Sequence, residues 1–170
     1  MTIAIDFGTS RIKLAYFDEE RGKSELMRLG NDERPYIPSL FYIGTDRQLF
    51  GEEAAVLIDD EPEAFLTEPL KRKLRDETVR AGNRIKVKPS ALLRVLFESL
   101  KARAEKEIPK FRNKAPEKLY LTIPVQYGPS DEKVLKEAAI QAGFEESNIH
   151  FIHEPVAAAK AWLMEVGGSD

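Results

Sequence analysis

Cysteine is absent from this chain of 170 residues. Its absence excludes a disulfide framework, a thiolate metal site and a cysteine nucleophile. The chain also lacks an apolar run near the ~20 residues that a helix needs to cross a bilayer. Its first residues alternate directly into a strand pattern, without the basic and long apolar segments of a cleavable signal. We therefore expect a cytoplasmic protein that is not inserted in a membrane.

A large excess of one charge is missing as well. The formal net charge is −3, and Lys and Arg residues are interleaved with acidic ones except in short clusters. The densest cluster, residues 71–75, is flanked by acidic residues, which is typical of a solvated face. Nucleic acid binding requires a basic stripe, so we do not expect it. The hydrophobic content of 42% and the charged content of 32% indicate a globular protein with one or two compact units.

The start of the chain predicts two strands joined by a tight turn. An apolar run at residues 3–5 leads through Asp6 into Gly8, Thr9 and Ser10, and the next residues alternate between polar and apolar. Gly8 permits a backbone conformation closed to other residues. Such a turn offers N–H groups and hydroxyls to a phosphate, and Asp6 would hold a hydrated cation beside it. The alternative is an ordinary hairpin whose turn contains these residues.

The rest of the pattern alternates short strands with helices. Further strands are expected at residues 24–29, 40–43, 48–50, 118–123 and 149–152. Helices are expected from Gly51, over residues 89–107, from an N-cap at Ser130 to Gly143, and from Pro155. The charged stretch 59–88 is interrupted by proline and glycine, which predicts loops around short helices. This order of elements indicates an α/β protein with a mixed sheet and helices.

Six motifs, in this order and at these spacings, carry a resemblance to a known family. They are IDFGTS at residues 5–10, IPSL at 37–40, FGEEAA at 50–55, LKR at 70–72, LTIPV at 121–125 and IHEPVAAA at 152–159. On these motifs the chain resembles the amino-terminal lobe of the nucleotide-binding domain of the Hsp70 (DnaK-like) family, within the actin, hexokinase and Hsp70 ATPase superfamily. The resemblance covers essentially all of the chain.

The resemblance implies a fold and a division of the chain. The fold would be a ribonuclease H-like mixed sheet flanked by helices, as in an actin-like ATPase lobe. Residues 1–38 and 116–170 would form this core subdomain, and residues 39–115 an inserted, smaller α+β subdomain. The family's second lobe and its substrate-binding domain have no counterpart in these residues. We therefore expect the chain alone to bind ATP weakly and to hydrolyse it negligibly.

The resemblance also assigns roles to residues of the first turn and of the inserted segment. Asp6 would hold Mg²⁺ through water, with K⁺ as a further candidate cation. Gly8, Thr9 and Ser10 would bind the β- and γ-phosphates of ATP or ADP through N–H groups and hydroxyls. Lys71 matches the catalytic lysine, which would neutralise charge at the γ-phosphate and help orient the attacking water.

Two more matching residues lie where the family has its interlobe hinge. Glu154 would take part in catalysis by holding a water near the metal, and Pro155 would switch between nucleotide states. A glutamate at a helix start is also favoured simply by the helix dipole.

The identity of the catalytic lysine stays open between Lys71 and Lys73, because the two lie only two residues apart.

Some positions depart from the family pattern. Phe7 replaces the commoner leucine, and His153 replaces the usual asparagine. A histidine can add pH sensitivity, but a neutral, hydrogen-bonded role is the alternative. Arg11 stands where small or polar residues are common, and it would contact nucleotide or face solvent. These differences indicate a divergent member of the family.

The resemblance implies the ATP-binding lobe of a molecular chaperone ATPase. Through a full-length protein, its partners would be unfolded clients, a J-domain co-chaperone and a nucleotide exchange factor. Two alternatives remain at this point. One is another ATPase or kinase of the same superfamily, which shares the phosphate turn. The other is a nucleotide-independent protein-interaction module that has lost the chemistry of its fold.

Overall fold

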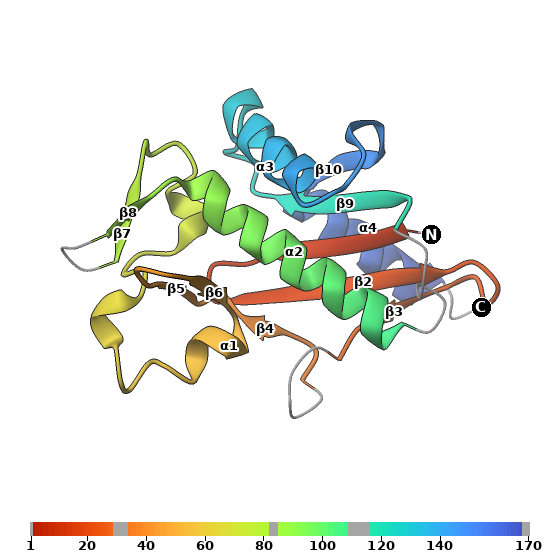
Figure 1. Cartoon of the computed structure of the whole chain (residues 1–170). Helices are drawn as coiled ribbons and strands as arrows, with labels where there is room; N and C mark the ends of the chain where they lie inside the picture. Colours follow the sequence, from red (N-terminus) through yellow and green to blue (C-terminus); the bar gives the residue numbers. More distant parts are fainter. Residues whose placement is uncertain (1, 29–33, 82–84, 109–115, 168–170) are drawn as a thin grey trace.

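The computed structural model describes residues 2–28, 34–81, 85–108 and 116–167. Strands and helices combine in a mixed α/β architecture, in which they alternate toward the end of the described chain (Figure 1). The strands are β1 (Thr2–Phe7), β2 (Arg11–Asp18), β3 (Lys23–Leu26), β4 (Ile37–Pro38), β5 (Phe41–Ile43), β6 (Gln48–Phe50), β7 (Val79–Ala81), β8 (Ile85–Val87), β9 (Lys118–Ile123) and β10 (Ile149–His153). The α-helices are α1 (Glu52–Ala55), α2 (Pro89–Glu107), α3 (Pro129–Gln141) and α4 (Glu154–Gly167). Short 3₁₀ helices include Pro62–Ala64, Leu70–Arg72 and Glu146–Asn148.

The main sheet mixes parallel and antiparallel strands. Its order is β10-β9-β1-β2-β3, and the two-residue strand β4 pairs with β2 as well. β1, β2 and β3 form an antiparallel meander, whereas β1, β9 and β10 run parallel. The carboxyl ends of these three parallel strands therefore meet at one edge of the sheet. The predicted α/β class with a mixed sheet and flanking helices is confirmed at this level.

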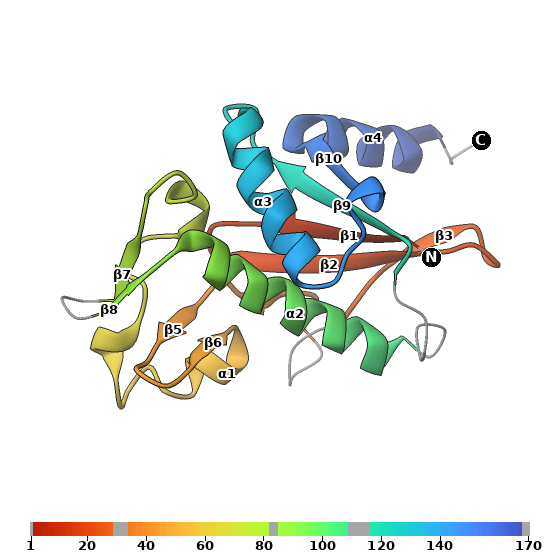
Figure 2. The same cartoon turned by 45° about the horizontal axis from the view of Figure 1, so that its top comes forward.

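The helices lie on both faces of the sheet. α2 and α3 cover one face, and α4 runs along the other (Figures 1 and 2). The side chains of β1 alternate between buried and half-buried, as the period of two predicts. The helical period of α2 likewise buries one apolar side, which consists of Leu92, Leu93, Leu96, Phe97 and Leu100.

The ends of α2 and α3 follow from proline and glycine. α2 spans the predicted residues and begins with Pro89, whose missing N–H would be unsatisfied in the first helical turn anyway. α3 also begins with a proline, so its N-cap is Gly128 and the predicted N-cap at Ser130 is wrong. Gly143 ends α3 as predicted, with φ +86°, the left-handed conformation that glycine adopts without strain. Its N–H donates to the carbonyl of Ile140 over 2.9 Å.

The inserted segment contains more strand than its sequence predicts. β5 and β6 form one antiparallel hairpin, close to the predicted strands. β7 and β8 form a second one inside the stretch that was expected to hold loops around short helices. That expectation is corrected for these six positions, since three-residue strands show too little alternation to be recognised. The residues between β7 and β8, 82–84, lie outside the described residues.

Smaller shifts affect three other boundaries. β3 ends at Leu26 although the predicted strand continues to residue 29, which lies outside the described residues. The helix expected from Gly51 is only the four-residue α1. α4 begins at Glu154, one residue before the expected start, and Pro155 occupies its second position.

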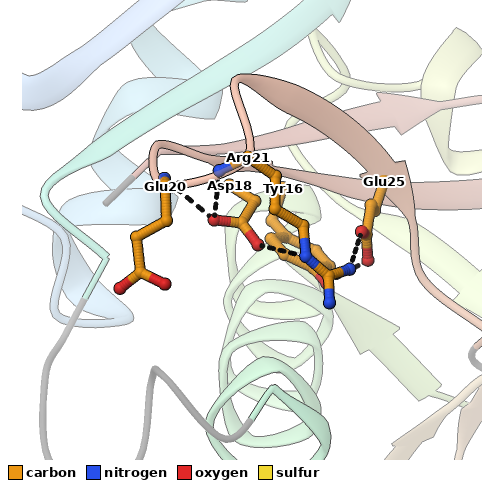
Figure 3. A network of polar contacts seen from close by, with 5 residues as sticks. All are labelled: Tyr16, Asp18, Glu20, Arg21 and Glu25. Atoms are coloured by element: carbon orange, nitrogen blue, oxygen red, sulfur yellow. Dashed lines mark hydrogen bonds and ion pairs between the residues drawn. The ribbon is translucent and has the colours of Figure 1, made fainter.

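A polar network closes the hairpin between β2 and β3 (Figure 3). The buried carboxylate of Asp18 accepts the backbone N–H of Glu20 over 3.0 Å and that of Arg21 over 3.3 Å. Arg21 also contacts Glu25 over 3.1 Å, and the hydroxyl of Tyr16 donates to the same carboxylate. This hydrogen bond lowers the pKa of Glu25. The network fixes the turn and is a structural feature of the hairpin.

The hydrophobic core runs through both parts of the expected division. One cluster joins strand residues such as Ile5 and Leu121 to Phe41, Leu70 and Leu96, which lie in the inserted segment. A second, small cluster of Tyr42, Ala54 and Phe65 lies within that segment. The division at residues 38 and 116 stays a prediction. None of the helices in the described part of the chain is long and apolar enough to cross a membrane.

Truncation of the core side of α2 should destabilise the fold. Leu96 is fully buried, and we expect Leu96→Ala to cost about 2–5 kcal/mol of unfolding free energy because it leaves a cavity. Lys106→Ala, on the exposed side of the same helix, should change it by less than about 0.5 kcal/mol. Urea denaturation of the three proteins measures both values. Equal effects of the two substitutions would contradict this packing of α2.

Candidate functional site

The candidate site lies where β1, β9 and β10 end side by side. Asp6, near the end of β1, is in register with Thr122 of β9. The hydroxyl of Thr122 donates to Oδ1 of Asp6 over 2.8 Å and so orients the half-buried carboxylate. Ligands of sheets with parallel strands bind beyond the carboxyl ends of those strands. This edge therefore has the geometry of a ligand site.

An open cleft of about 790 Å³ borders this edge. Its walls come from the turn after β1, from the 70–76 segment, from the loop between β9 and α3, and from the start of α4. Among the residues predicted for the site, the cleft is lined by Thr9, Lys71, Glu154 and Pro155. Its volume falls within the roughly 300–1,000 Å³ of small-molecule sites.

Lys71 and Glu154 contact each other in this cleft although 83 positions separate them. Nζ of Lys71 donates to Oε1 of Glu154, and the lysine side chain is only 10% exposed. Lys73 points elsewhere, with Nζ 3.1 Å from Glu68 and 3.5 Å from Asp76. It lines a separate pocket with Glu68. The geometry therefore places Lys71, and not Lys73, beside Glu154.

Two contacts hold the 70–76 segment against the start of α3. The hydroxyl of Tyr127 donates to the backbone carbonyl of Lys71. The guanidinium of Arg75 donates two hydrogen bonds to the carboxylate of Asp131, one of them from Nε to Oδ1 over 2.8 Å. Asp131 is buried and also accepts the backbone N–H of Gly128 over 2.9 Å. Together these contacts fix the backbone position from which the side chain of Lys71 extends.

The electrostatics of these contacts follow from their surroundings. The Arg75 guanidinium holds the pKa of Asp131 below its usual range, against the opposing effect of burial. The same pair raises the pKa of Arg75. Burial raises the pKa of Tyr127 well above its usual range, and the charges of Asp131 and Glu154 add to the effect. Tyr127 is therefore a neutral hydroxyl donor at any physiological pH.

The turn after β1, residues 8–10, agrees only in part with the features predicted for it. Thr9 and Ser10 are exposed, which leaves their hydroxyls accessible. Gly8 has no left-handed φ, so the predicted reason for glycine there is corrected. A Cβ at this position would lie 2.3 Å from the carbonyl oxygen of Arg11, so the close backbone approach is what requires glycine. The N–H of Gly8 donates to the carbonyl of Asp6 over 3.2 Å.

The cleft does not include every predicted residue. Asp6, Gly8 and Ser10 lie on β1 or in its turn but do not line the cleft. Arg11 stacks its guanidinium on the ring of Tyr36, 4.5 Å from the ring centroid, instead of pointing into the cleft. His153 ends β10 as an exposed residue that does not line the cleft either.

The acidic residues of the described part form no metal cage. No group of three or more His, Cys, Asp or Glu side chains gathers there in a way that could hold a metal ion. Mg²⁺ often keeps several waters and binds one or two carboxylates together with substrate phosphates. A single oriented carboxylate at Asp6 fits that mode, in which the ion arrives with a phosphate. It does not fit a metal ion bound by the protein alone.

Tyr127, Asp131 and Arg75 were not identified as site residues from the sequence. Asp131 was expected only in the first turn of a helix, and Arg75 only in a charge cluster. A sequence signal existed for Asp131, because a carboxylate at the third helical position can cap the helix start. Nothing in the sequence pairs it with an arginine 56 positions away.

Comparisons with known proteins leave the family open. No protein-family model matches the chain, and no curated protein matches it. Membership of the Hsp70 family therefore stays a prediction from the motifs.

The pair of Asp131 and Arg75 predicts a pH-dependent stability. The pKa of Asp131 is lower in the folded state than in the unfolded state, so its ionised carboxylate adds to the free energy of unfolding. This contribution is complete above the unfolded-state pKa of about 3.9 and is lost as the pH falls through the folded-state pKa. We expect Asp131→Asn to lower the unfolding free energy by about 1–2 kcal/mol at pH 7, a figure reduced for the exposure of Arg75. The difference from wild type should shrink below about pH 4. Urea denaturation from pH 7 to pH 3 measures it.

The matched control for this prediction is Glu132→Gln, which removes a carboxylate from the same helical turn. Its effect should be smaller at pH 7, because Glu132 has no ion pair among the described residues. A difference between Asp131→Asn and wild type that stays constant down to pH 3 would show that the carboxylate charge is irrelevant.

The turn after β1 predicts a steric effect. Gly8→Ala should cost about 1–3 kcal/mol of unfolding free energy, because the new Cβ meets the backbone carbonyl of Arg11. Gly128→Ala is the control, since a Cβ there meets nothing within 4 Å and φ is −114°. It should cost less than about 1 kcal/mol. Thermal unfolding compares the two, and a Gly8→Ala protein as stable as wild type would disprove the close approach.

Proposed function

We propose that this chain is the ATP-binding lobe of an Hsp70-like molecular chaperone ATPase. The observation that carries the proposal is the meeting of Lys71 and Glu154 in a cleft beside Thr9. Three motifs far apart in the chain, at the first turn, in the inserted segment and at the start of α4, supply these residues. Their convergence at the carboxyl ends of parallel strands supports a shared chemical role.

The chemistry of these residues suits a terminal phosphate. A lysine ammonium can neutralise charge that develops on a γ-phosphate, and a carboxylate beside it can orient a water. The exposed hydroxyls of Thr9 and Ser10 can donate to phosphate oxygens. Mg²⁺ would supply further charge neutralisation at the phosphates, and Asp6 would hold it through water. In this proposal the lobe is ribonuclease H-like and actin-like.

The proposal includes a second lobe and cytoplasmic partners. ATP held between two lobes would drive their closure, so this chain alone should bind nucleotide weakly. Clients, a J-domain co-chaperone and an exchange factor would act through the full-length protein. A cytoplasmic location is part of the same proposal.

One observation is also compatible with the alternative of a nucleotide-independent interaction module. The apolar side chains of α4 are largely exposed, with 61% for Trp162, 61% for Leu163 and 79% for Met164. Large exposed apolar groups on one helix are typical of a surface that contacts another protein segment. A second lobe would supply such a contact as well, so the choice depends on nucleotide chemistry.

The test is ATP turnover with Mg²⁺ by the full-length protein and by this chain alone. We expect slow hydrolysis by the full-length protein, and Lys71→Ala should reduce it by about 100-fold or more while nucleotide binding persists. Lys73→Ala is the matched control and should change turnover less than about twofold, because Lys73 does not line this cleft and its ammonium is directed to Glu68 and Asp76.

Two results would contradict the proposal. Absence of ATP binding by the full-length protein would favour the interaction module. Turnover that depends on Lys73 and not on Lys71 would place the chemistry outside the cleft described above.

A further inference from the structure

The charges that line the cleft are paired, with one exception. Lys71 pairs with Glu154, and Arg75 pairs with Asp131. Asp76 lies 3.5 Å from Nζ of Lys73. The remaining charged residue of the lining, Arg72, is exposed, and its guanidinium has no hydrogen bond or ion pair within the described ranges.

The backbone on both sides of this arginine is held in place. The backbone carbonyl of its neighbour Lys71 accepts a hydrogen bond from the hydroxyl of Tyr127, and Arg75 is bound to the buried Asp131. The backbone N–H of Arg72 donates to the carbonyl of Pro69 over 2.9 Å within the 3₁₀ helix. Arg72 thus lines the cleft from a backbone that is held in place, so binding a ligand orders little more than its own side chain.

An entering anion meets two different cations here. To bind Lys71, a phosphate must displace the carboxylate of Glu154, whereas to bind Arg72 it displaces only water. A guanidinium also presents several N–H donors in a planar fork that matches two oxygens of one phosphate. Arg72 is therefore the cation best suited to make the first contact with the ligand.

We propose that Arg72 is a phosphate-binding residue of this cleft, which recognises the terminal phosphates of a polyphosphate ligand before Lys71 exchanges Glu154 for them. The inference rests on the proposed function in taking the ligand to be a nucleoside triphosphate. Free inorganic pyrophosphate carries the same chemistry without a nucleoside.

The test titrates this chain with pyrophosphate and, separately, with ATP at low ionic strength, and follows backbone amide signals by NMR. Both ligands should shift signals in the 70–76 segment. Arg72→Gln should weaken both affinities about tenfold through the loss of charge-assisted hydrogen bonds. Arg72→Lys should restore part of the loss, because it keeps the charge and loses the fork.

Arg94→Gln is the matched control. It removes the same charge from an exposed position of α2, where the guanidinium lies 3.6 Å from Glu98, and it should change both affinities less than about twofold. An effect as large as that of Arg72→Gln would show that only net charge matters and would overturn the inference. Pyrophosphate binding that is unchanged in Arg72→Gln, or absent from the wild-type chain, would overturn it as well.

Failure of the inference and failure of the proposed function give different results. Pyrophosphate binding that depends on Arg72, without ATP turnover by the full-length protein, supports this inference and removes the proposed function. ATP turnover that requires Lys71, together with pyrophosphate binding that is unchanged in Arg72→Gln, supports the proposed function and removes this inference.

Discussion

The parallel pairing of β1, β9 and β10 is the constraint on which the rest of the structure depends. In this register Asp6 lies opposite Thr122, and His153 lies opposite Ile123. The chain segments that leave these strands, namely the Gly8 turn, the loop to α3 and the first turn of α4, consequently emerge at one edge. Residues more than 100 positions apart become neighbours through backbone pairing alone. A one-residue shift of β9 would turn Thr122 to the opposite face and remove it from Asp6.

The edge of the sheet by itself brings carboxylates and hydroxyls together but no lysine. The cations of the cleft come from the 70–76 segment, which reaches the edge because Leu70 is buried in the core and because Tyr127 and Asp131 bind the segment. An exposed ion pair contributes little to stability, but the carboxylate of Asp131 is buried and also satisfies an N–H at the start of α3. One side chain thus holds both a helix start and a wall of the cleft.

Periodicity and motif order explain which features of the fold and site were predictable. The alternation in β1 and the helical spacing of α2 reflect one buried side each, so their residues could be assigned from the sequence. The β7–β8 hairpin is too short to alternate, and Pro129 moves the start of α3 away from the expected Ser130. The resemblance to a family assigned catalytic roles to both Lys71 and Glu154, but their direct contact was not predicted from the sequence. The partnership of Arg75 with Asp131 depends on tertiary packing, and no local pattern encodes which acid an arginine meets.

The contact between Lys71 and Glu154 also links the proposed ligand to α4. If a phosphate bound the ammonium of Lys71, Glu154 would lose its cation but stay in the first turn of α4, where the helix dipole stabilises a negative charge. Its side chain is 39% exposed, so water can replace the lysine. The proposed exchange would therefore cost less than the loss of a buried pair. Pro155 follows directly, and the arrival of a ligand would change the charge environment of α4 at its first residue, from which the exposed apolar side chains of that helix extend.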